Sequence, residues 1–198
     1  MINPLRYPGA KRSLVNYIEA LLQANHLEGC TFLEPYAGSA AVGLELLQRN
    51  RIARLVLCEK DILIYAFWEC VFRDTDILCN TIENVDVSID TWHALQRYRE
   101  MTTLEEAPLP ELAYAGLFFN RTNFSGILKA NPVGGIGQTS KYTIDCRFNK
   151  QKLIQITIGN EHLLLRQPLG LHRQSSQGHF PPFHTVHAPF SAHGVPSL

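Results

Sequence analysis

The sequence predicts an α/β fold, with helices wound around a parallel sheet. Two short apolar runs of strand type, residues 30–36 and 53–58, are each followed by a segment with the apolar spacing of a helix. Small residues fill the turn between the first run and its helix, so a ligand can approach the backbone closely. This turn, residues 34–42, is the expected place for a nucleotide-like cofactor, at the carboxyl end of the first strand.

The remaining elements follow from apolar spacing and from capping residues. We expect helices over residues 12–27, 39–49, 61–72, 75–82, 88–101 and 111–119. Asp61 is a candidate N-cap, and Ser88 and Asp90 are candidates for another helix start. Glycines and prolines break any long element between residues 120 and 149, where we expect loops.

Composition excludes several classes of protein. No apolar run approaches the roughly 20 residues needed to cross a bilayer, and the first residues do not form a signal peptide. The five cysteines are scattered and lack Cys-x-x-Cys spacing, so they suggest neither a disulfide framework nor a zinc site. We therefore expect a cytoplasmic protein that binds no metal and no membrane.

Charge divides the chain, although the net charge is zero. Residues 59–111 carry four basic and twelve acidic side chains, whereas residues 112–155 carry six basic side chains and one acidic. A basic segment rich in Asn, Gly, Thr and Ser suits the surface of a polyanion, although charge alone also fits a solvated loop face. We expect a cofactor-binding domain over 1–111, a recognition segment over 112–155 and a separate tail over 156–198.

The tail differs from the rest of the chain in composition. From residue 159 onward it holds six of the eight histidines and five of the eleven prolines. Helical character returns only weakly over 150–154, and no helical or strand period is visible after Leu165. Clustered histidines can bind a metal, but their irregular spacing argues against it. We expect a disordered tail, and the abrupt change also fits translation in a wrong reading frame.

Two acidic residues end the predicted strands. Glu34 and Pro35 precede the small residues of the turn, where a carboxylate would repel a phosphate and instead suits a cationic or hydroxyl-rich ligand. Glu59 ends the second strand, at a position from which an acid accepts hydrogen bonds from ribose hydroxyls in wound sheets. The alternative for the turn is a plain strand–helix connection, which the residues alone leave open. The alternative for Glu59 is a surface acid, and its spacing from the Gly/Ser turn favours ligand binding.

Two further clusters combine aromatic and polar side chains. Tyr7, Gly9 and Lys11 precede the first helix, and such a set can stack on a ligand and pair with its carboxylate. The run from Phe118 to Gly126 interleaves aromatic rings, amides and a guanidinium, which suit phosphates and bases. The alternatives are an N-terminal turn and a helix end with core phenylalanines.

Taken together, these motifs resemble those of the Dam-like adenine-specific DNA methyltransferases. The family's aromatic-x-Gly-x-Lys pattern is met by residues 7–11. Its Phe-x-Glu-Pro-aromatic-x-Gly-x-Gly pattern is met by residues 32–40, with Ala40 in place of the last glycine. Its Asn-Arg-x-x-x-x-Gly signature falls on residues 120–126.

The resemblance implies a Rossmann-like methyltransferase fold with an inserted DNA-recognition segment, incomplete at the carboxyl terminus. It implies S-adenosylmethionine as cofactor, whose sulfonium would explain the acid at Glu34, with Lys11 on the methionine carboxylate and Glu59 on the ribose. The implied cofactor-binding residues are Tyr7, Gly9, Lys11, Glu34, Pro35, Gly38, Ser39 and Glu59. The implied DNA-binding residues are Asn120, Arg121, Thr122, Asn123, Lys129 and Lys141. The implied reaction moves a methyl group to the exocyclic amine of an adenine flipped out of duplex DNA.

The sequence departs from the family at the catalytic motif. The family's Asp-Pro-Pro-Tyr, whose Asp and Pro hold the adenine amine, is absent. The nearest string is Phe180-Pro181-Pro182-Phe183, and its first residue cannot accept a hydrogen bond. No catalytic residue is therefore predicted, and one hypothesis is that this chain is impaired in methyl transfer.

Three other hypotheses remain open from the sequence. The first is a non-catalytic remnant that binds S-adenosylmethionine or DNA. The second is a dinucleotide oxidoreductase, against which Glu34 and the lack of a Gly-x-Gly-x-x-Gly motif argue. The third is a damaged gene product without a function.

Overall fold

A small parallel sheet organises the amino-terminal part of the molecule. The computed structural model describes residues 3–6, 11–165 and 170–173. Three parallel strands lie in the order β1-β2-β3, and they are β1 (Thr31–Glu34), β2 (Arg54–Glu59) and β3 (Gly170–Arg173). This mixture of helices and parallel strands agrees with the predicted α/β class.

Helices and short 3-10 turns make up most of the rest. The α-helices are α1 (Val15–Ala24), α2 (Ala41–Gln48), α3 (Ile62–Arg73), α4 (Thr75–Asn84), α5 (Ile89–Leu95), α6 (Leu109–Thr122) and α7 (Lys150–Leu165). The 3-10 turns are η1 (Lys11–Leu14), η2 (Gln96–Glu100), η3 (Leu104–Glu106), η4 (Phe124–Gly126) and η5 (Ile144–Arg147). Within the described residues, no helix is long and apolar enough to span a membrane.

Helix caps agree in part with the prediction. The Asp61 carboxylate accepts hydrogen bonds from the N–H groups of Leu63 and Ile64, which fixes the start of α3. Ser88 caps α5 by accepting from the N–H of Thr91. Asp90 was the other candidate, but it lies inside the first turn of α5.

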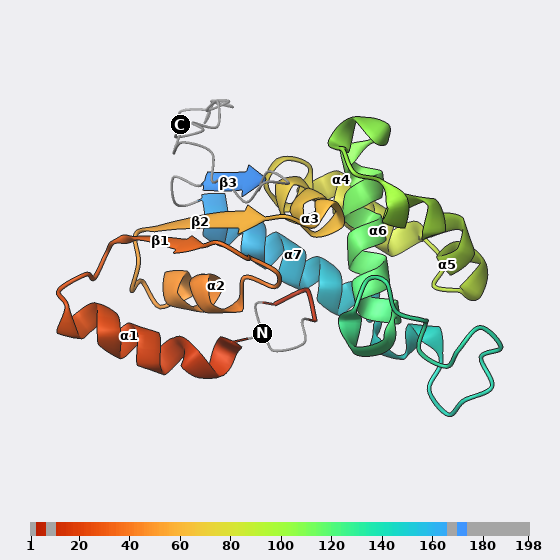
Figure 1. Cartoon of the computed structure of the whole chain (residues 1–198), viewed down its shortest axis with the longest axis horizontal. Coiled ribbons are helices and arrows are strands. Elements are labelled where there is room, and N and C mark those ends of the chain that lie inside the picture. The colour runs from red at the N-terminus through yellow and green to blue at the C-terminus, as the bar shows by residue number, and fades with distance from the viewer. Residues whose placement is uncertain (1–2, 7–10, 166–169, 174–198) are drawn as a thin grey trace, which may run out of the picture.

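The hydrophobic core is centred on α3 and α6. Figure 1 shows α6 running across the direction of the strands, on the side toward which they point. The two helices approach closely at Gly116, where a Cβ would come within 2.5 Å of the Leu63 carbonyl oxygen. Trp68 of α3 and Phe118 of α6 are fully buried. The expected domain boundary after residue 111 therefore falls inside a core helix.

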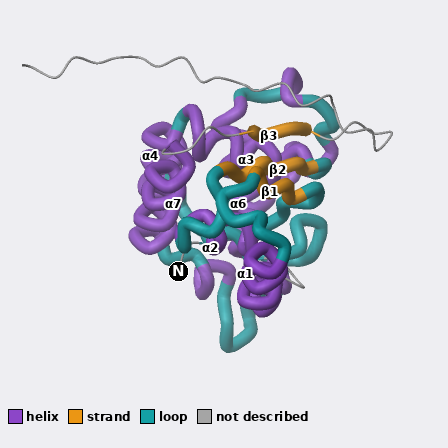
Figure 2. The backbone as a smooth tube through the Cα atoms, turned by 90° about the vertical axis from the view of Figure 1, so that its left-hand side faces the viewer, coloured by secondary structure: helices purple, strands orange, loops and turns teal. Residues whose placement is uncertain are grey.

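The structure corrects two expectations for the carboxyl-terminal part. The weak helix expected over 150–154 continues as α7 to Leu165, and Figure 2 shows it beside α4. Its buried side chains, among them Leu153 and Leu164, stabilise it by packing rather than by local propensity. The second correction is a strand, β3, which pairs with β2 in a part of the chain where the sequence shows no strand periodicity. A strand of four residues is too short to show a clear alternation of apolar and polar side chains. The string 180–183 lies outside the described residues.

Candidate functional site

The turn after β1 is held from within by Glu34. Oε1 of its carboxylate accepts a hydrogen bond of 2.5 Å from the backbone N–H of Gly43, in the first turn of α2. A larger residue does not fit at Gly43, because a Cβ would lie 2.3 Å from Leu55 Cδ1 and 3.0 Å from Glu34 Oε1. The helix therefore packs directly on the sheet, and its first turn meets the end of β1.

The environment of Glu34 disfavours a negative charge. Burial raises the pKa of Glu34 to about 7, and the hydrogen bond from Gly43 offsets only part of this rise. Glu34 is only half-buried, so part of the residue is accessible to solvent. A cation beside it would favour the charged form and lower the pKa. The turn thus offers a cationic ligand a carboxylate that gains stability from the contact.

The second acid, Glu59, fixes the same turn. Its buried Oε2 accepts from the N–H of Gly38 at 2.8 Å, and its Oε1 accepts from the N–H groups of Lys60 and Asp61 at 2.7 and 2.9 Å. The carbonyl of Gly38 in turn accepts from Trp68 Nε1 at 2.8 Å. Hydrogen bonds therefore fix both the N–H and the carbonyl of Gly38. Glu34 and Glu59 each bond a backbone N–H group in or directly after the turn that follows β1.

Two residues of the turn adopt positive φ angles. Gly38 has φ 47° and Ala40 has φ 49°, and Ala40 directly precedes α2. Left-handed backbone costs an L-residue roughly 1–2 kcal/mol relative to its ordinary conformations. Ala40 occupies the position of the last glycine of the motif. Its backbone is therefore strained where the turn meets α2, whereas a glycine there would not be.

The other predicted cofactor-binding residues have different surroundings. Lys11 begins η1 and is exposed, Pro35 is exposed, and Ser39 is buried at 4% exposure. Tyr7 and Gly9 lie outside the described residues. Tyr36 was not predicted, yet it is 76% exposed beside the turn, where its ring is open to a ligand. Of the predicted cofactor-binding residues, Gly38 and Glu59 are bonded to each other, and Glu34 bonds Gly43 at the far end of the same turn.

In the recognition segment, Asn120 faces inward. Asn120 is fully buried, and its Nδ2 donates to the carbonyls of Arg6 and Gly126 at 2.6 and 3.1 Å. Its Oδ1 accepts from the N–H of Arg6 at 2.6 Å. In this arrangement its side chain does not reach a DNA base.

Thr122 and Asn123 are also fully buried. The hydroxyl of Thr122 donates to the carbonyl of Phe118 within α6. Asn123 Nδ2 donates to the carbonyls of Ile127 and Leu128 at 3.1 and 2.8 Å, which shapes the loop that follows. The arrangement does not support the DNA contacts expected of these side chains, because their polar groups already bond the protein.

Arg121 is half-buried and bonds the amino-terminal segment. Its Nε donates to the carbonyl of Pro4 at 2.6 Å. Burial, together with the positive charge of Arg6 nearby, lowers the pKa of Arg121 to about 10. The guanidinium therefore lies near a second positive charge, that of Arg6, and hydrogen-bonds a backbone carbonyl of the protein itself.

The exposed side chains of the recognition segment include basic and large apolar ones. Lys129 and Lys141 are exposed, as a DNA contact requires. Phe124 is 65% exposed and Tyr142 61% exposed, and Lys141 Nζ lies 5.8 Å from the centre of the Tyr142 ring. A lysine beside an exposed ring suits a phosphate next to a base. Phe124 was part of the predicted run, but the sequence does not show whether a phenylalanine at a helix end points inward or outward.

Two side chains that the sequence gave no reason to single out support this segment. The Arg99 guanidinium lies 4.8 Å from the Trp92 ring and 4.3 Å from the Phe119 ring, and its NH2 group donates to the carbonyl of Ala130. Trp92 Nε1 donates to Asn123 Oδ1 at 2.7 Å. Residues about 30 positions earlier thus hold the recognition loop.

The described residues hold no cluster of three or more His, Cys, Asp or Glu side chains that could bind a metal. The sequence matches the family described as D12 class N6 adenine-specific DNA methyltransferase over residues 7–161. The matched range includes the Glu34 turn, Glu59 and the recognition segment. No curated protein matches the chain.

Proposed function

The chain belongs to the D12 class N6 adenine-specific DNA methyltransferase family, and on that premise we propose that it holds S-adenosylmethionine at the turn after β1 and duplex DNA on its basic segment. The observation that carries the proposal is the carboxyl of Glu34, half-buried and with a raised pKa, at the carboxyl end of a parallel strand. We extend the proposal to a Rossmann-like arrangement, which three parallel strands with β2 in the middle support.

The side chains at the turn fit the cofactor. Bound S-adenosylmethionine supplies a methyl group on a positively charged sulfur. Glu34 offers this cation a carboxylate, and Ala37, Gly38 and Ser39 place only small side chains in the turn. A carboxylate has about four acceptor sites, so Glu59, with three in use, retains one for a ribose hydroxyl.

The DNA side of the proposal depends on the exposed face of the recognition segment. Lys129 and Lys141 bind phosphates, and Phe124 stacks on or wedges between bases. Asn120 and Asn123 hold the loop that presents these side chains. All five cysteines are free thiols, which fits a cytoplasmic protein.

The second candidate function is binding without transfer. One observation favours it: the sequence contains no Asp-Pro-Pro-Tyr motif to hold the adenine amine. Both candidates need the Glu34 turn and the basic segment, so binding alone does not separate them.

Titration calorimetry with S-adenosylmethionine and, separately, with duplex DNA tests binding, and a transfer assay with the tritiated methyl group of S-adenosylmethionine tests the reaction. The transfer assay uses duplex DNA, and DNA already methylated at adenine N6 serves as the blank. Binding that Glu34→Gln weakens and that Glu28→Gln, an exposed matched control, does not weaken supports the proposed cofactor site. Transfer to adenine supports the methyltransferase, and binding without transfer supports the second candidate. A protein that binds neither ligand would refute both.

A further inference from the structure

The recognition loop, residues 124–131, presents exposed side chains from a closed base. Phe124 is 65% exposed, Ile127 is 47% exposed, and Lys129 is exposed. At the base, the N–H of Phe124 donates to the carbonyl of Asn131 at 3.0 Å. The exposed side chains combine two apolar groups with a positive charge, which is the combination that the proposed DNA contact uses.

Three carbonyl groups of the loop are bonded from inside the protein. Asn123 Nδ2 donates to the carbonyls of Ile127 and Leu128 at 3.1 and 2.8 Å. The NH2 group of Arg99 donates to the carbonyl of Ala130 at 2.8 Å. These bonds fix the backbone on both sides of the exposed lysine, so the direction of its side chain depends on them.

The guanidinium of Arg99 lies against two aromatic rings. Its central carbon is 4.8 Å from the centre of the Trp92 ring and 4.3 Å from the centre of the Phe119 ring. Its NH1 group donates to Gln96 Oε1 at 2.8 Å. Trp92 Nε1 donates to Asn123 Oδ1 at 2.7 Å, so one of the two rings also bonds the residue that holds the rest of the loop. We call Arg99, Trp92 and Asn123 the loop brace.

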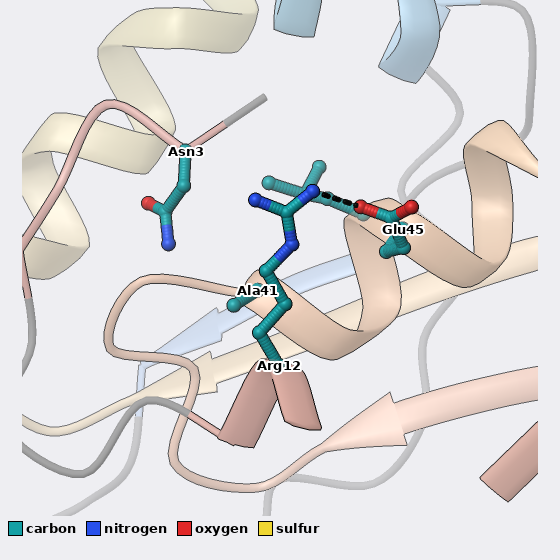
Figure 3. Close-up of a pocket in the computed structure, with 5 residues that line it drawn as sticks. Asn3, Arg12, Ala41 and Glu45 are labelled. Atoms are coloured by element: carbon teal, nitrogen blue, oxygen red, sulfur yellow. Dashed lines mark hydrogen bonds and ion pairs between the residues drawn. The ribbon is translucent and has the colours of Figure 1, made fainter. Parts of the chain in front are cut away.

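Arg99 differs from an arginine that pairs with a carboxylate. Arg12 reaches Glu45 of α2 at 3.0 Å, as Figure 3 shows. Asn3 and Ala41 line the small hollow beside that pair. Arg99 instead donates to neutral oxygens, and burial lowers its pKa. Its Nε is buried and has no hydrogen-bond partner within the described residues.

These surroundings make the guanidinium of Arg99 unfavourable for stability. A buried donor without a partner and a cation withdrawn from water both destabilise the folded state, and the contacts with the rings offset part of this effect. An apolar side chain of similar length would fill the same space without either cost. The property that an apolar side chain lacks is the hydrogen bond to the carbonyl of Ala130. The loop is therefore the structure that depends on the guanidinium.

We propose that Arg99 is a positioning residue for DNA binding, which holds the recognition loop in its binding conformation through the carbonyl of Ala130. The inference rests on the DNA side of the proposed function. A loop that is ordered before DNA arrives loses less conformational freedom on binding, so the bond raises the affinity without a contact between Arg99 and DNA. The effect is confined to DNA, because the hydrogen bonds of Glu34 and Glu59 involve no residue of the loop brace.

The test compares Arg99→Met with Arg97→Met in the full chain. Both substitutions remove one positive charge from η2, and Arg97 also lies over a ring, 4.7 Å from the centre of Tyr98. Arg97 bonds the Tyr98 hydroxyl and pairs with Glu111 rather than with the loop, so it is the matched control. Fluorescence anisotropy measures the affinity for duplex DNA over a range of salt concentrations. Calorimetry measures the affinity for S-adenosylmethionine, and amide hydrogen exchange is followed over residues 123–133.

Arg99→Met is expected to bind DNA about tenfold more weakly than the wild type, because the DNA must then order the loop. The slope of log affinity against log salt stays that of the wild type, since the number of phosphate contacts does not change. Exchange becomes faster over residues 123–133, and the affinity for S-adenosylmethionine is unchanged. Arg97→Met shows a much smaller loss of DNA affinity and no change in exchange. Arg99→Lys, which can still donate to the carbonyl of Ala130, recovers part of the affinity.

Three results would overturn the inference. The first is an equal loss of DNA affinity in Arg99→Met and Arg97→Met, which would assign the effect to charge alone. The second is a salt slope lowered by about 0.9 in Arg99→Met, which would make Arg99 a direct phosphate contact. The third is a lower unfolding midpoint with unchanged DNA affinity, which would make its role merely structural. If Arg99→Met does not fold, Arg99→Lys and Arg97→Lys provide the same comparison.

Failure of the proposed function gives a different pattern. A wild-type protein that binds no DNA refutes the DNA side of that proposal and with it the role of Arg99 in binding. The exchange measurement needs no ligand, so it still decides whether Arg99 holds residues 123–133. The two failures are therefore distinguishable.

Discussion

Glu34→Gln separates the two effects of the acid at the turn, its cost in stability and its attraction for a cation. The substitution keeps an oxygen for the N–H of Gly43 and removes the charge. Burial raises the pKa of Glu34 from 4.5 to about 7, so between these values the folded protein binds more protons than the unfolded chain. The free energy of unfolding therefore falls as the pH rises through this window.

The size of this effect follows from the two pKa values. The difference between 4.5 and about 7 corresponds to about 3 kcal/mol, at about 1.36 kcal/mol per pKa unit. This figure is an upper bound, because Glu34 is only half-buried and solvent screens part of the cost. Glu34→Gln is therefore expected to match the wild type near pH 4.5 and to be up to about 3 kcal/mol more stable at pH 8.

Urea unfolding at pH 5 and pH 8 measures this difference, and Glu28→Gln is the matched control at an exposed position. The control is expected to differ from the wild type by the same small amount at both values. Calorimetry measures the other expected effect of the substitution, a loss of affinity for S-adenosylmethionine. The affinity of the wild type for S-adenosylmethionine rises with pH through 7 as Glu34 ionises, whereas the variant binds about tenfold more weakly and without this rise. A stability gain from Glu34→Gln that is equal at pH 5 and pH 8 would refute the reasoning.

Three further predictions concern the turn and the DNA-facing surface. Ala40→Gly relieves the positive φ of 49° and is expected to stabilise the protein by about 0.5–1 kcal/mol in urea unfolding, because greater freedom of the unfolded chain offsets part of the gain. Gly43→Ala forces a Cβ against Leu55 and is expected to destabilise it by about 2–3 kcal/mol; an unchanged unfolding midpoint would contradict the packing. Lys129→Ala and Lys141→Ala are each expected to lower the slope of log affinity for DNA against log salt by about 0.9, with unfolding unchanged, and a slope that stays the same would remove that lysine from the interface.

Much of the cofactor half could be predicted because its contacts are local or set by strand geometry. Two parallel strands that each end in an acid bring those acids to one edge of a sheet, and small residues between strand and helix make a turn. The structure adds contacts that no periodicity shows. Trp68 of α3 donates a hydrogen bond to the carbonyl of Gly38 in the turn. The N–H of Gly43 donates to the carboxyl of Glu34.

The carboxyl-terminal part was harder to predict from residue patterns. Gly159 and the β-branched residues before it lower helical propensity, yet α7 runs through them because its apolar side chains pack against α3 and α4. The four residues of β3 form a strand because β2 offers a free edge beside them.

The amino-acid sequence by itself determined the α/β class, the acidic turn at Glu34, the family and the basic character of the recognition segment. Those features depend on residue type and on spacing along the chain. Only the tertiary structure decided whether the polar side chains at 120–126 face DNA or hydrogen-bond the protein itself. Asn120 bonds a residue 114 positions away, so nothing near it in the sequence shows that it faces Arg6 rather than a base. Whether an amide reads DNA or holds the protein depends on burial, and burial follows from how distant segments pack.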